Sequence, residues 1–222
     1  MCARGLVSLA TLGVLMTALR CIHPGKADPH LWTTDFQWER PYLTSTGRNP
    51  YFVLEPGWVL ELADGEHRLT VTVLQDTIRV DGVWCRIVEE RETKGGELVE
   101  VSRNYFAISK RSNSVYYFGE DAGGAWQSGQ GGARFGLMMP GLPLVGARYY
   151  EEIAPGVAMD RAEIVSVSDT ITTPAGIFSP CLKILETTPL EPLAREYKWY
   201  APDIGLVQDG SMKLVSYGRR GS

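Results

Sequence analysis

The sequence contains no apolar run long enough to span a bilayer, and it carries no excess of basic residues. Its longest uncharged stretch, residues 5–19, would rise about 22 Å as a helix, less than the roughly 30 Å of a hydrocarbon core. The 22 Lys and Arg are outnumbered by 26 Asp and Glu, which argues against a nucleic-acid binder because such proteins need a basic face. Four Cys and three His, without a Cys-x-x-Cys pair, give no zinc-ligand spacing. What remains is a globular chain, since 44% apolar residues suffice for a packed core.

The amino-terminal residues have the pattern of a secretory signal. A short basic start is followed by the uncharged residues 5–19 and by small residues that end at Ala27, a plausible cleavage site. We therefore predict a signal peptide over residues 1–27 and a secreted or periplasmic mature protein with no transmembrane span. Lipidation at Cys21 is an alternative, which Arg20 disfavours because acylated cysteines follow a small residue. A short buried helix is another alternative.

Loss of residues 1–27 leaves two cysteines, Cys85 and Cys181, in an exported chain. Exported proteins commonly pair their cysteines, so a Cys85–Cys181 disulfide is predicted, with two buried free thiols as the alternative. The same cut removes three basic residues and no acidic one, so the mature chain is more acidic than the −4 of the whole. It is not expected to bind nucleic acid or anionic membranes, and neither a metal nor another cofactor is predicted.

Glycine and proline, which are typical of turns, occur at short intervals along the rest of the sequence. Glycine (24 residues) and proline (13 residues) together exceed the about 12% share of an average protein. Between them lie segments of period-two alternation, as in residues 67–76, where one face carries Leu69, Val71 and Val73. We predict an all-β fold, a single antiparallel meander of ten to twelve strands that forms a curved sheet or half-open barrel. Residues 28–48 are predicted to be an extended segment and residues 49–222 a single β domain.

One stretch, residues 119–146, is richer in glycine than the turns between strands require. It holds nine glycines and also the apolar run Phe135–Pro140, which is too hydrophobic for a free linker. Long loops of this kind are often functional. We therefore predict a Gly-rich flap that folds back on the domain, with Met138 and Met139 serving either as a lid or as plain packing.

Five motifs occur together and in order along the chain. They are residues 49–59 (NPYFVLEPGWV), 81–85 (DGVWC), 116–121 (YYFGED), 173–182 (TPAGIFSPCL) and 196–207 (EYKWYAPDIGLV). Together they resemble a family of uncharacterised secreted bacterial all-β proteins, over roughly residues 49–215 of the chain. More distantly, the last two motifs resemble envelope domains of the LolA/LolB type. The resemblance implies an exported, curved antiparallel sheet or barrel, and it carries no activity to transfer.

Residues suited to catalysis are few, because no serine stands in a G-x-S-x-G turn and histidines are scarce. Glu152 and Asp160 flank the turn at Pro155–Gly156, and a hairpin there would bring two carboxylates within the range that glycosidases use. A secreted hydrolase is therefore an alternative function, and a solvated hairpin tip is the simpler interpretation. Glu120 and Asp121 lack the alternating acids of a calcium loop, so no metal site is predicted there.

The leading functional hypothesis rests on aromatic residues at alternate strand positions. Alternate side chains of a barrel strand point inward, and an aromatic-lined interior capped by the flap suits an apolar ligand. The predicted ligand-binding residues are Trp58, Trp84, Tyr105, Tyr117, Phe135, Met138, Tyr197 and Trp199. We predict an exported, non-catalytic envelope or extracellular protein that binds a lipid, another apolar small molecule, or a partner. The alternative is a structural or interaction protein in which these rings only fill the core.

Overall fold

The computed structural model describes residues 31–122 and 125–220, so the predicted signal peptide and Cys21 lie outside the described residues. The residues from Trp32 onward form one compact unit. It begins with a short 3-10 helix, η2 (Gln37–Tyr42). The prediction of an extended segment over residues 28–48 missed this helix. Its first turn is held by the Asp35 carboxylate, which accepts a hydrogen bond from the Gln37 N–H at 3.0 Å.

The other regular elements of the described chain are strands, which confirms the all-β prediction. The structure has seventeen strands where ten to twelve were predicted, because several connections contain strands of only two or three residues. The strands are β1 (Leu43–Thr44), β2 (Gly47–Asn49), β3 (Phe52–Leu54), β4 (Trp58–Asp64), β5 (His67–Val80), β6 (Val83–Lys94), β7 (Glu97–Ser109), β8 (Val115–Glu120), β9 (Trp126–Gln127), β10 (Arg134–Met139), β11 (Arg148–Tyr150), β12 (Glu152–Ile153), β13 (Arg161–Thr173), β14 (Gly176–Thr187), β15 (Glu196–Ala201), β16 (Gly205–Asp209) and β17 (Met212–Arg219).

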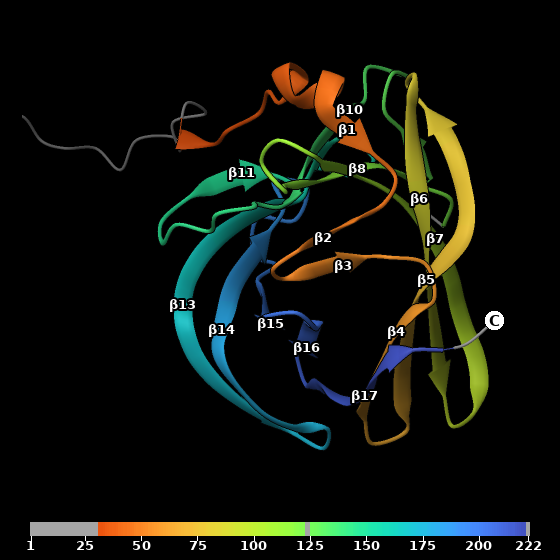
Figure 1. Ribbon diagram of the computed structural model, residues 1–222, viewed down its shortest axis with the longest axis vertical. Coiled ribbons are helices and arrows are strands. Elements are labelled where there is room, and N and C mark those ends of the chain that lie inside the picture. Colours follow the sequence, from red (N-terminus) through yellow and green to blue (C-terminus); the bar gives the residue numbers. More distant parts are fainter. Residues whose placement is uncertain (1–30, 123–124, 221–222) are drawn as a thin grey trace, which may run out of the picture. The chain divides into compact units, whose positions relative to one another are not determined.

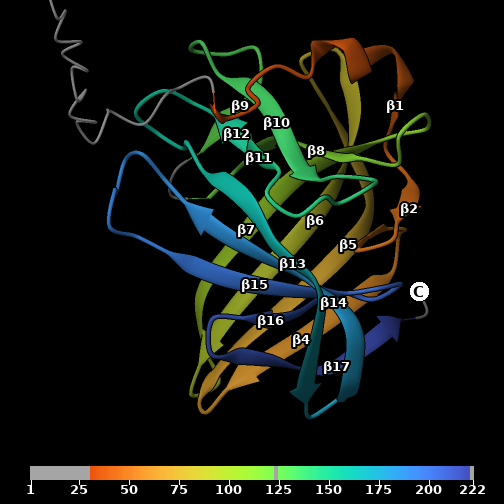
Figure 2. The same cartoon turned by 90° about the vertical axis from the view of Figure 1, so that its left-hand side faces the viewer.

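Fifteen strands belong to one antiparallel sheet that curls round on itself (Figure 1 and Figure 2). Its order is β11-β13-β14-β15-β16-β17-β4-β5-β6-β7-β8-β10-β12, with β1 beside β7 and β9 beside β8. The two ends of this order meet because β11 and β12 are successive parts of one segment, residues 148–153. In this sealing segment Tyr149 pairs with Ala162 of β13, whereas Glu152 pairs with Phe135 of β10. The sheet is thus a nearly closed barrel.

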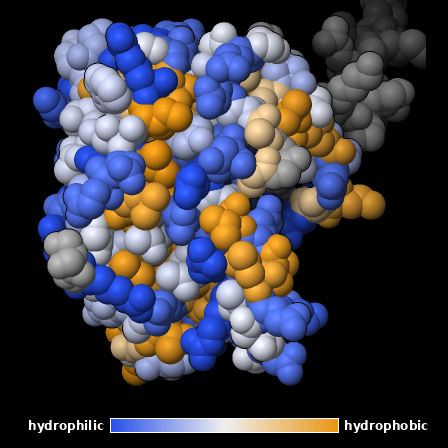
Figure 3. Space-filling model, turned by 90° about the vertical axis from the view of Figure 1, so that its right-hand side faces the viewer, coloured by the Kyte–Doolittle hydropathy of each residue, from blue (hydrophilic) through white to orange (hydrophobic). Residues whose placement is uncertain are grey.

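The longest strands form two facing walls, β5 to β7 on one side and the curved β13–β14 hairpin on the other (Figure 1). The outer face of the β5–β7 wall is largely hydrophilic, with scattered hydrophobic residues between the polar ones (Figure 3). The inner faces form a first core cluster, which includes Phe106, Tyr116 and Leu182. A second core cluster, around Cys181 and Leu214, packs beneath the tip of the β13–β14 hairpin. The division between a polar outer face and an apolar inner face follows the period-two pattern of half-buried strands.

A separate two-stranded hairpin, β2–β3, lies between the two walls (Figure 1). The buried Asn49 amide donates a hydrogen bond to the carbonyl of Asn113, in the β7–β8 turn, at 2.8 Å. The Pro50 carbonyl accepts one from the N–H of Asp203, in the β15–β16 turn, at 2.7 Å. The hairpin therefore bridges both sides of the barrel and covers its interior, which is the structural use of the NPYF motif.

The glycine-rich stretch is not the predicted flap, because it contains β9 and β10 and β10 lies within the barrel between β8 and β12. Phe135 and Met139 are buried in the first core cluster. A Cβ on Gly136 would lie 2.4 Å from the carbonyl oxygens of both Tyr150 and Glu151. Glycine is needed here so that β10 can approach the backbone of the sealing segment.

The predicted Cys85–Cys181 disulfide is wrong, since both thiols are free and buried. Cys85 lies in β6 within the first core cluster, and Cys181 lies in β14 within the second. Strands β6 and β14 are not neighbours in the sheet, whereas a disulfide needs Cα atoms within about 7 Å of each other. Burial raises the pKa of the Cys85 thiol to about 12, so this thiol is inert as a nucleophile.

Candidate functional site

The barrel interior holds a small chamber with a volume of about 90 Å³. Its walls come from the β2–β3 hairpin, from β4 to β7, from β10, and from the β15–β16 region. The apolar part of the lining, which we call the apolar chamber, consists of Phe52, Val53, Trp58, Leu60, Leu69, Val71, Val73, Val88, Phe106, Met138, Tyr200, Ile204, Gly205 and Leu206. Three charged residues complete the lining: Glu90, Lys198 and Asp209.

These charged residues belong to a larger group in the barrel interior. The Lys198 Nζ of β15 lies 2.8 Å from a Glu186 carboxylate oxygen and 3.9 Å from one of Asp209. Glu90 comes from β6 in the facing wall. Glu151 of the sealing segment is 4% exposed, and its charge interacts with those of Glu186 and Lys198. We call the four acids Glu90, Glu151, Glu186 and Asp209 the acid cluster.

Burial raises the pKa of every carboxyl in the acid cluster. The pKa of Glu90 rises to about 7 and that of Asp209 to about 6, and the pKa values of Glu151 and Glu186 are also raised. Burial acts in the opposite sense on Lys198, but the Glu186 and Asp209 carboxylates outweigh it and hold the pKa of Lys198 well above its usual range. The interior thus combines one stable ammonium with four carboxyls whose pKa values are raised, of which Glu90, at about 7, is roughly half ionised at neutral pH.

Of the predicted ligand-binding residues, Trp58 and Met138 line the apolar chamber. The Trp58 indole N–H donates a hydrogen bond to the Ile204 carbonyl at 3.0 Å, which fixes the ring in place. Tyr105 and Phe135 are buried in the first core cluster without lining the chamber. Tyr117 packs against that cluster. Its ring stacks on the ring of Phe106, a chamber residue, with the two centroids 4.8 Å apart.

Tyr197 and Trp199 share one face of β15, but that face points away from the apolar chamber. The Lys183 Nζ lies 4.3 Å from the Tyr197 ring centroid, and the Trp199 indole N–H donates to Asp169 at 2.9 Å. The opposite face of β15 carries Lys198 and Tyr200 into the chamber. The prediction that Tyr197 and Trp199 line the interior is therefore wrong, because the polar-looking face is the inner one.

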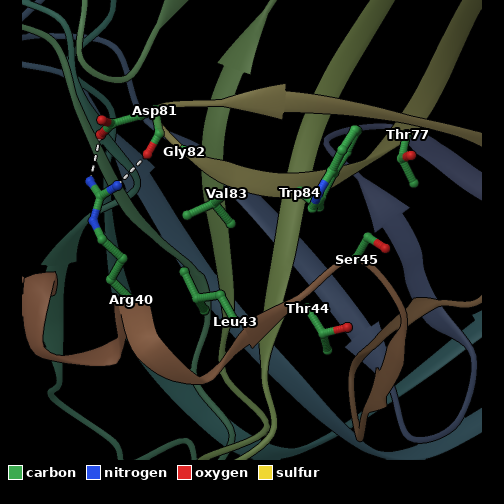
Figure 4. Close-up of a pocket in the computed structure, with 9 residues that line it drawn as sticks. All are labelled: Arg40, Leu43, Thr44, Ser45, Thr77, Asp81, Gly82, Val83 and Trp84. Carbon is green, nitrogen blue, oxygen red and sulfur yellow. Dashed lines mark hydrogen bonds and ion pairs between the residues drawn. The ribbon is translucent and has the colours of Figure 1, made fainter.

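Trp84 lies outside the barrel, on an open groove of about 580 Å³ (Figure 4). Its side chain is 58% exposed. The groove runs between residues 40–45 and the β5–β6 turn, where the Arg40 guanidinium pairs with the side chain and the carbonyl of Asp81. Figure 4 shows this pair at one end of the groove and Trp84 at the other. Trp84 is thus a surface residue and not part of the interior.

The alternative catalytic pair, Glu152 and Asp160, is brought together by the hairpin but does not form an open site. Glu152 is 2% exposed, and one of its carboxylate oxygens accepts a hydrogen bond from the Asp160 N–H at 2.6 Å. Burial, together with the nearby Asp160 carboxylate, raises the pKa of Glu152 to about 8. Glycosidases need both carboxyls at the substrate. Glu152 instead holds the hairpin, and Asp160 alone is exposed.

Two further observations concern the chemistry that the chain offers. Within residues 31–122 and 125–220, no three His, Cys, Asp or Glu side chains come together in a way that would hold a metal ion. None of the helical segments in the described part of the chain has the length and apolar character of a membrane-spanning helix. The acid cluster is therefore an electrostatic feature of the interior and not a compact metal cage.

Sequence reasoning missed the charged residues of the interior. Lys198 stands between two aromatics in the motif at residues 196–207, and both faces of that strand carry rings. Glu90 lies in a run of charged residues, 89–92, which is typical of an exposed strand. The one available signal was the alternation of Glu196, Lys198 and Tyr200 on a single face. That signal becomes informative only once the inward face is known.

Replacing Glu90 by glutamine tests the electrostatics of the interior. The pKa of Glu90 is raised to about 7, so the folded state holds a proton that the unfolded state releases above about pH 4.5, and stability falls as the pH rises between these values. We expect Glu90→Gln to be more stable than the parent by about 3 kcal/mol at pH 8, with no difference at pH 4. Urea unfolding at both pH values measures this.

The matched control for this experiment is Glu92→Gln, two residues along the same strand. Glu92 is exposed and does not line the chamber, so its replacement should change stability little at either pH. A pH dependence of unfolding that is identical in the parent and in Glu90→Gln would contradict the expectation.

Comparison with known proteins gives no family assignment. No protein-family model matches the chain, and no curated protein matches it. Among solved structures, a crystal structure described as a "putative lipoprotein" from Parabacteroides distasonis ATCC 8503 aligns with it. The alignment has 13% sequence identity and a TM-score of 0.37, and it covers 79% of this chain and 100% of the other. A likeness at this level assigns no function.

Proposed function

We propose that this chain is an exported, non-catalytic β-barrel protein of the cell envelope or extracellular space that binds a small apolar molecule in its interior. The observation that carries the proposal is the apolar chamber, which is covered by the β2–β3 hairpin and lined by residues of β4 to β7, of β10 and of the β15–β16 region. Binding sites for small molecules are typically concave and mainly apolar, with a few polar groups that orient the ligand. The chamber has this character.

The size of the chamber limits the ligand. Its volume of about 90 Å³ is below the roughly 300–1,000 Å³ of pockets for drug-sized ligands. It is also smaller than the aromatic-lined interior predicted from the sequence, because the β2–β3 hairpin and rings such as Phe106 occupy much of the barrel. The proposed ligand is therefore a molecule of a few carbon atoms and not a long-chain lipid.

The export part of the proposal rests on the sequence. The uncharged residues 5–19 and the small residues up to Ala27 form the pattern of a cleavable secretory signal. The resemblance of the five motifs to secreted bacterial β proteins supports the same location. Mass spectrometry of the protein recovered from an exporting bacterial host tests this part, since cleavage predicts a chain that starts near Asp28.

Filling the chamber tests the binding. Val71 lines it from β5, and Val71→Phe should occupy most of the free volume. We expect xenon and 1-butanol to perturb the NMR signals of the Trp58 indole N–H and the Met138 methyl group in the parent protein. The affinity of both probes should fall at least tenfold in Val71→Phe, a change of about 1.4 kcal/mol.

Thr70→Phe is the control, because Thr70 neighbours Val71 and points to the opposite face of the same strand. It should leave the binding of both probes unchanged. If neither probe perturbs Trp58 or Met138 in the parent, the chamber is not a binding site. The protein would then act through its surface, and the open groove beside Trp84 is one place to look for a partner.

A further inference from the structure

The residues around the acid cluster lie in one row across neighbouring strands. Tyr149 of the sealing segment pairs with Ala162 of β13, and Ala162 pairs with Glu186 of β14. Paired residues in a sheet point to the same face, so Tyr149 and Glu186 flank a single small alanine side chain. On β15 the direct partner of Glu186 is Glu196, and Lys198, two residues further on the same face, is its diagonal neighbour. Asp209 is the direct partner of Lys198 on β16. The row therefore runs across five strands on the inner face of the barrel.

Four polar atoms of this row and of Glu151, two residues after Tyr149 in the sealing segment, have no hydrogen-bond partner in the structure. They are one carboxylate oxygen each of Glu151, Glu186 and Asp209, and the hydroxyl of Tyr149. Glu151 and Tyr149 are only 4% and 2% exposed. Buried polar atoms are nearly always satisfied in folded proteins. Several unsatisfied acceptors along one row therefore indicate a place where a donor group binds.

The row also has more negative than positive charge. Lys198 is the cation that acts on all four carboxyls of the acid cluster. Desolvation of these carboxyls and their mutual repulsion raise their pKa values. A second cation placed among them would relieve the repulsion and favour the ionised carboxylates.

We propose that the acid cluster binds the ammonium group of a small aliphatic amine whose alkyl part lies in the apolar chamber. An ammonium group supplies three N–H donors and one positive charge, and the row offers unpartnered acceptors and excess negative charge. Glu90, Asp209 and Lys198 line the chamber, and Lys198 contacts Glu186, which like Glu151 and Tyr149 does not line it. The ammonium group of a short molecule in the chamber would therefore lie beside Glu90 and Asp209, with Glu186 reached through Lys198. This inference rests on the proposed function and names the chemical class of its ligand.

Three matched probes of equal chain length test the inference at pH 7.5 and constant ionic strength: n-butylammonium chloride, 1-butanol and sodium butyrate. NMR titration of the full chain gives each dissociation constant. We expect n-butylammonium to bind at least tenfold more tightly than 1-butanol, and butyrate to bind more weakly than both. Sodium chloride at equal concentration should cause no shift of the Tyr149 signals.

Two variants test which residues cause the preference for n-butylammonium over 1-butanol. Glu151→Gln should reduce the preference for n-butylammonium over 1-butanol to about threefold or less, with the affinity for 1-butanol unchanged. Tyr149→Phe removes a different unpartnered group and should reduce the preference in the same direction, so the test stands even if Glu151→Gln fails to fold. Glu163→Gln is the control, because Glu163 pairs with Arg148 on the opposite face of β13. It should leave the preference intact.

The outcomes separate this inference from the proposed function. Binding of 1-butanol without a preference for n-butylammonium overturns the inference and leaves the chamber as an apolar site. Shifts of Tyr149 with n-butylammonium, in a protein that does not bind 1-butanol, support the acid cluster as an amine site and overturn the apolar chamber. Tighter binding of butyrate than of n-butylammonium overturns the inference, as does an unchanged preference in both Glu151→Gln and Tyr149→Phe.

Discussion

Replacing Lys198 by methionine is expected to lower the free energy of unfolding by about 3 kcal/mol at pH 8, because it leaves buried carboxylates without their cation. The Lys198 ammonium lies 2.8 Å from Glu186 and 3.9 Å from Asp209, and its side chain is 22% exposed. Methionine has a similar length and apolar stem, so the change removes mainly the charge. Urea denaturation followed by tryptophan fluorescence measures the loss.

The pH dependence of this loss identifies its cause. The pKa values of Asp209 and Glu90 are raised to about 6 and about 7, so at pH 5 both carboxyls are largely protonated and need no cation. The destabilisation of Lys198→Met should therefore shrink as the pH falls from 8 to 5. Lys183→Met, on the outer face of the adjacent strand, is the control and should cost less than about 1 kcal/mol. An equal loss for Lys198→Met at both pH values would mean that shape, and not charge, determines the effect.

Replacing Gly136 by alanine is expected to destabilise the barrel by at least about 3 kcal/mol, although the change adds a single methyl group. The added Cβ would lie 2.4 Å from the carbonyl oxygens of Tyr150 and Glu151. Both obstacles are backbone atoms of the sealing segment, so β10 and that segment must separate. The midpoint of thermal unfolding should fall, and hydrogen exchange of the amides in residues 148–153 should accelerate.

Gly47→Ala provides the comparison for this substitution. A Cβ on Gly47 would meet the Cγ2 methyl group of the Ile108 side chain at 2.9 Å, and a side chain can shift by a few tenths of an ångström more easily than two backbone carbonyls. Its cost should therefore be much smaller than that of Gly136→Ala. If both variants lose equal stability, or if exchange in residues 148–153 is unchanged in Gly136→Ala, the close approach at Gly136 does not seal the barrel.

The strands of the β4–β7 region could be predicted from the sequence because their turns carry strong local signals. Asp64–Gly65, Asp81–Gly82 and Lys94–Gly96 stand at the ends of alternating segments, and the structure places hairpin turns at each of them. Local turn chemistry determines such boundaries. Residues 119–146 could not be predicted in the same way. Some of their glycines lie against segments that are distant in the chain, as Gly136 does against Glu151 and Gly141 against Ser112.

The inner face of β15 shows why the candidate site was harder to predict than the fold. Period-two alternation shows which residues share a face, but it does not show which face is buried when both are mixed. Tyr197 and Trp199 contain the larger apolar area, yet they point away from the chamber, whereas Lys198 points into it. Lys198 is tolerated there because Glu186 and Asp209, from two other strands, pair with it. Such a pairing depends on the sheet order and cannot be inferred from one strand.

The position of β17 between two other strands determines what a proteolytic cut before this strand would expose. It pairs with β16 on one side and with β4 on the other, where Leu214 stands opposite Leu62. A protease that cuts before residue 212 and releases β17 would leave two open strand edges at once. Unpaired edges recruit strands from other chains. The integrity of the eight residues of β17, Met212–Arg219, thus separates a self-contained barrel from a template for aggregation.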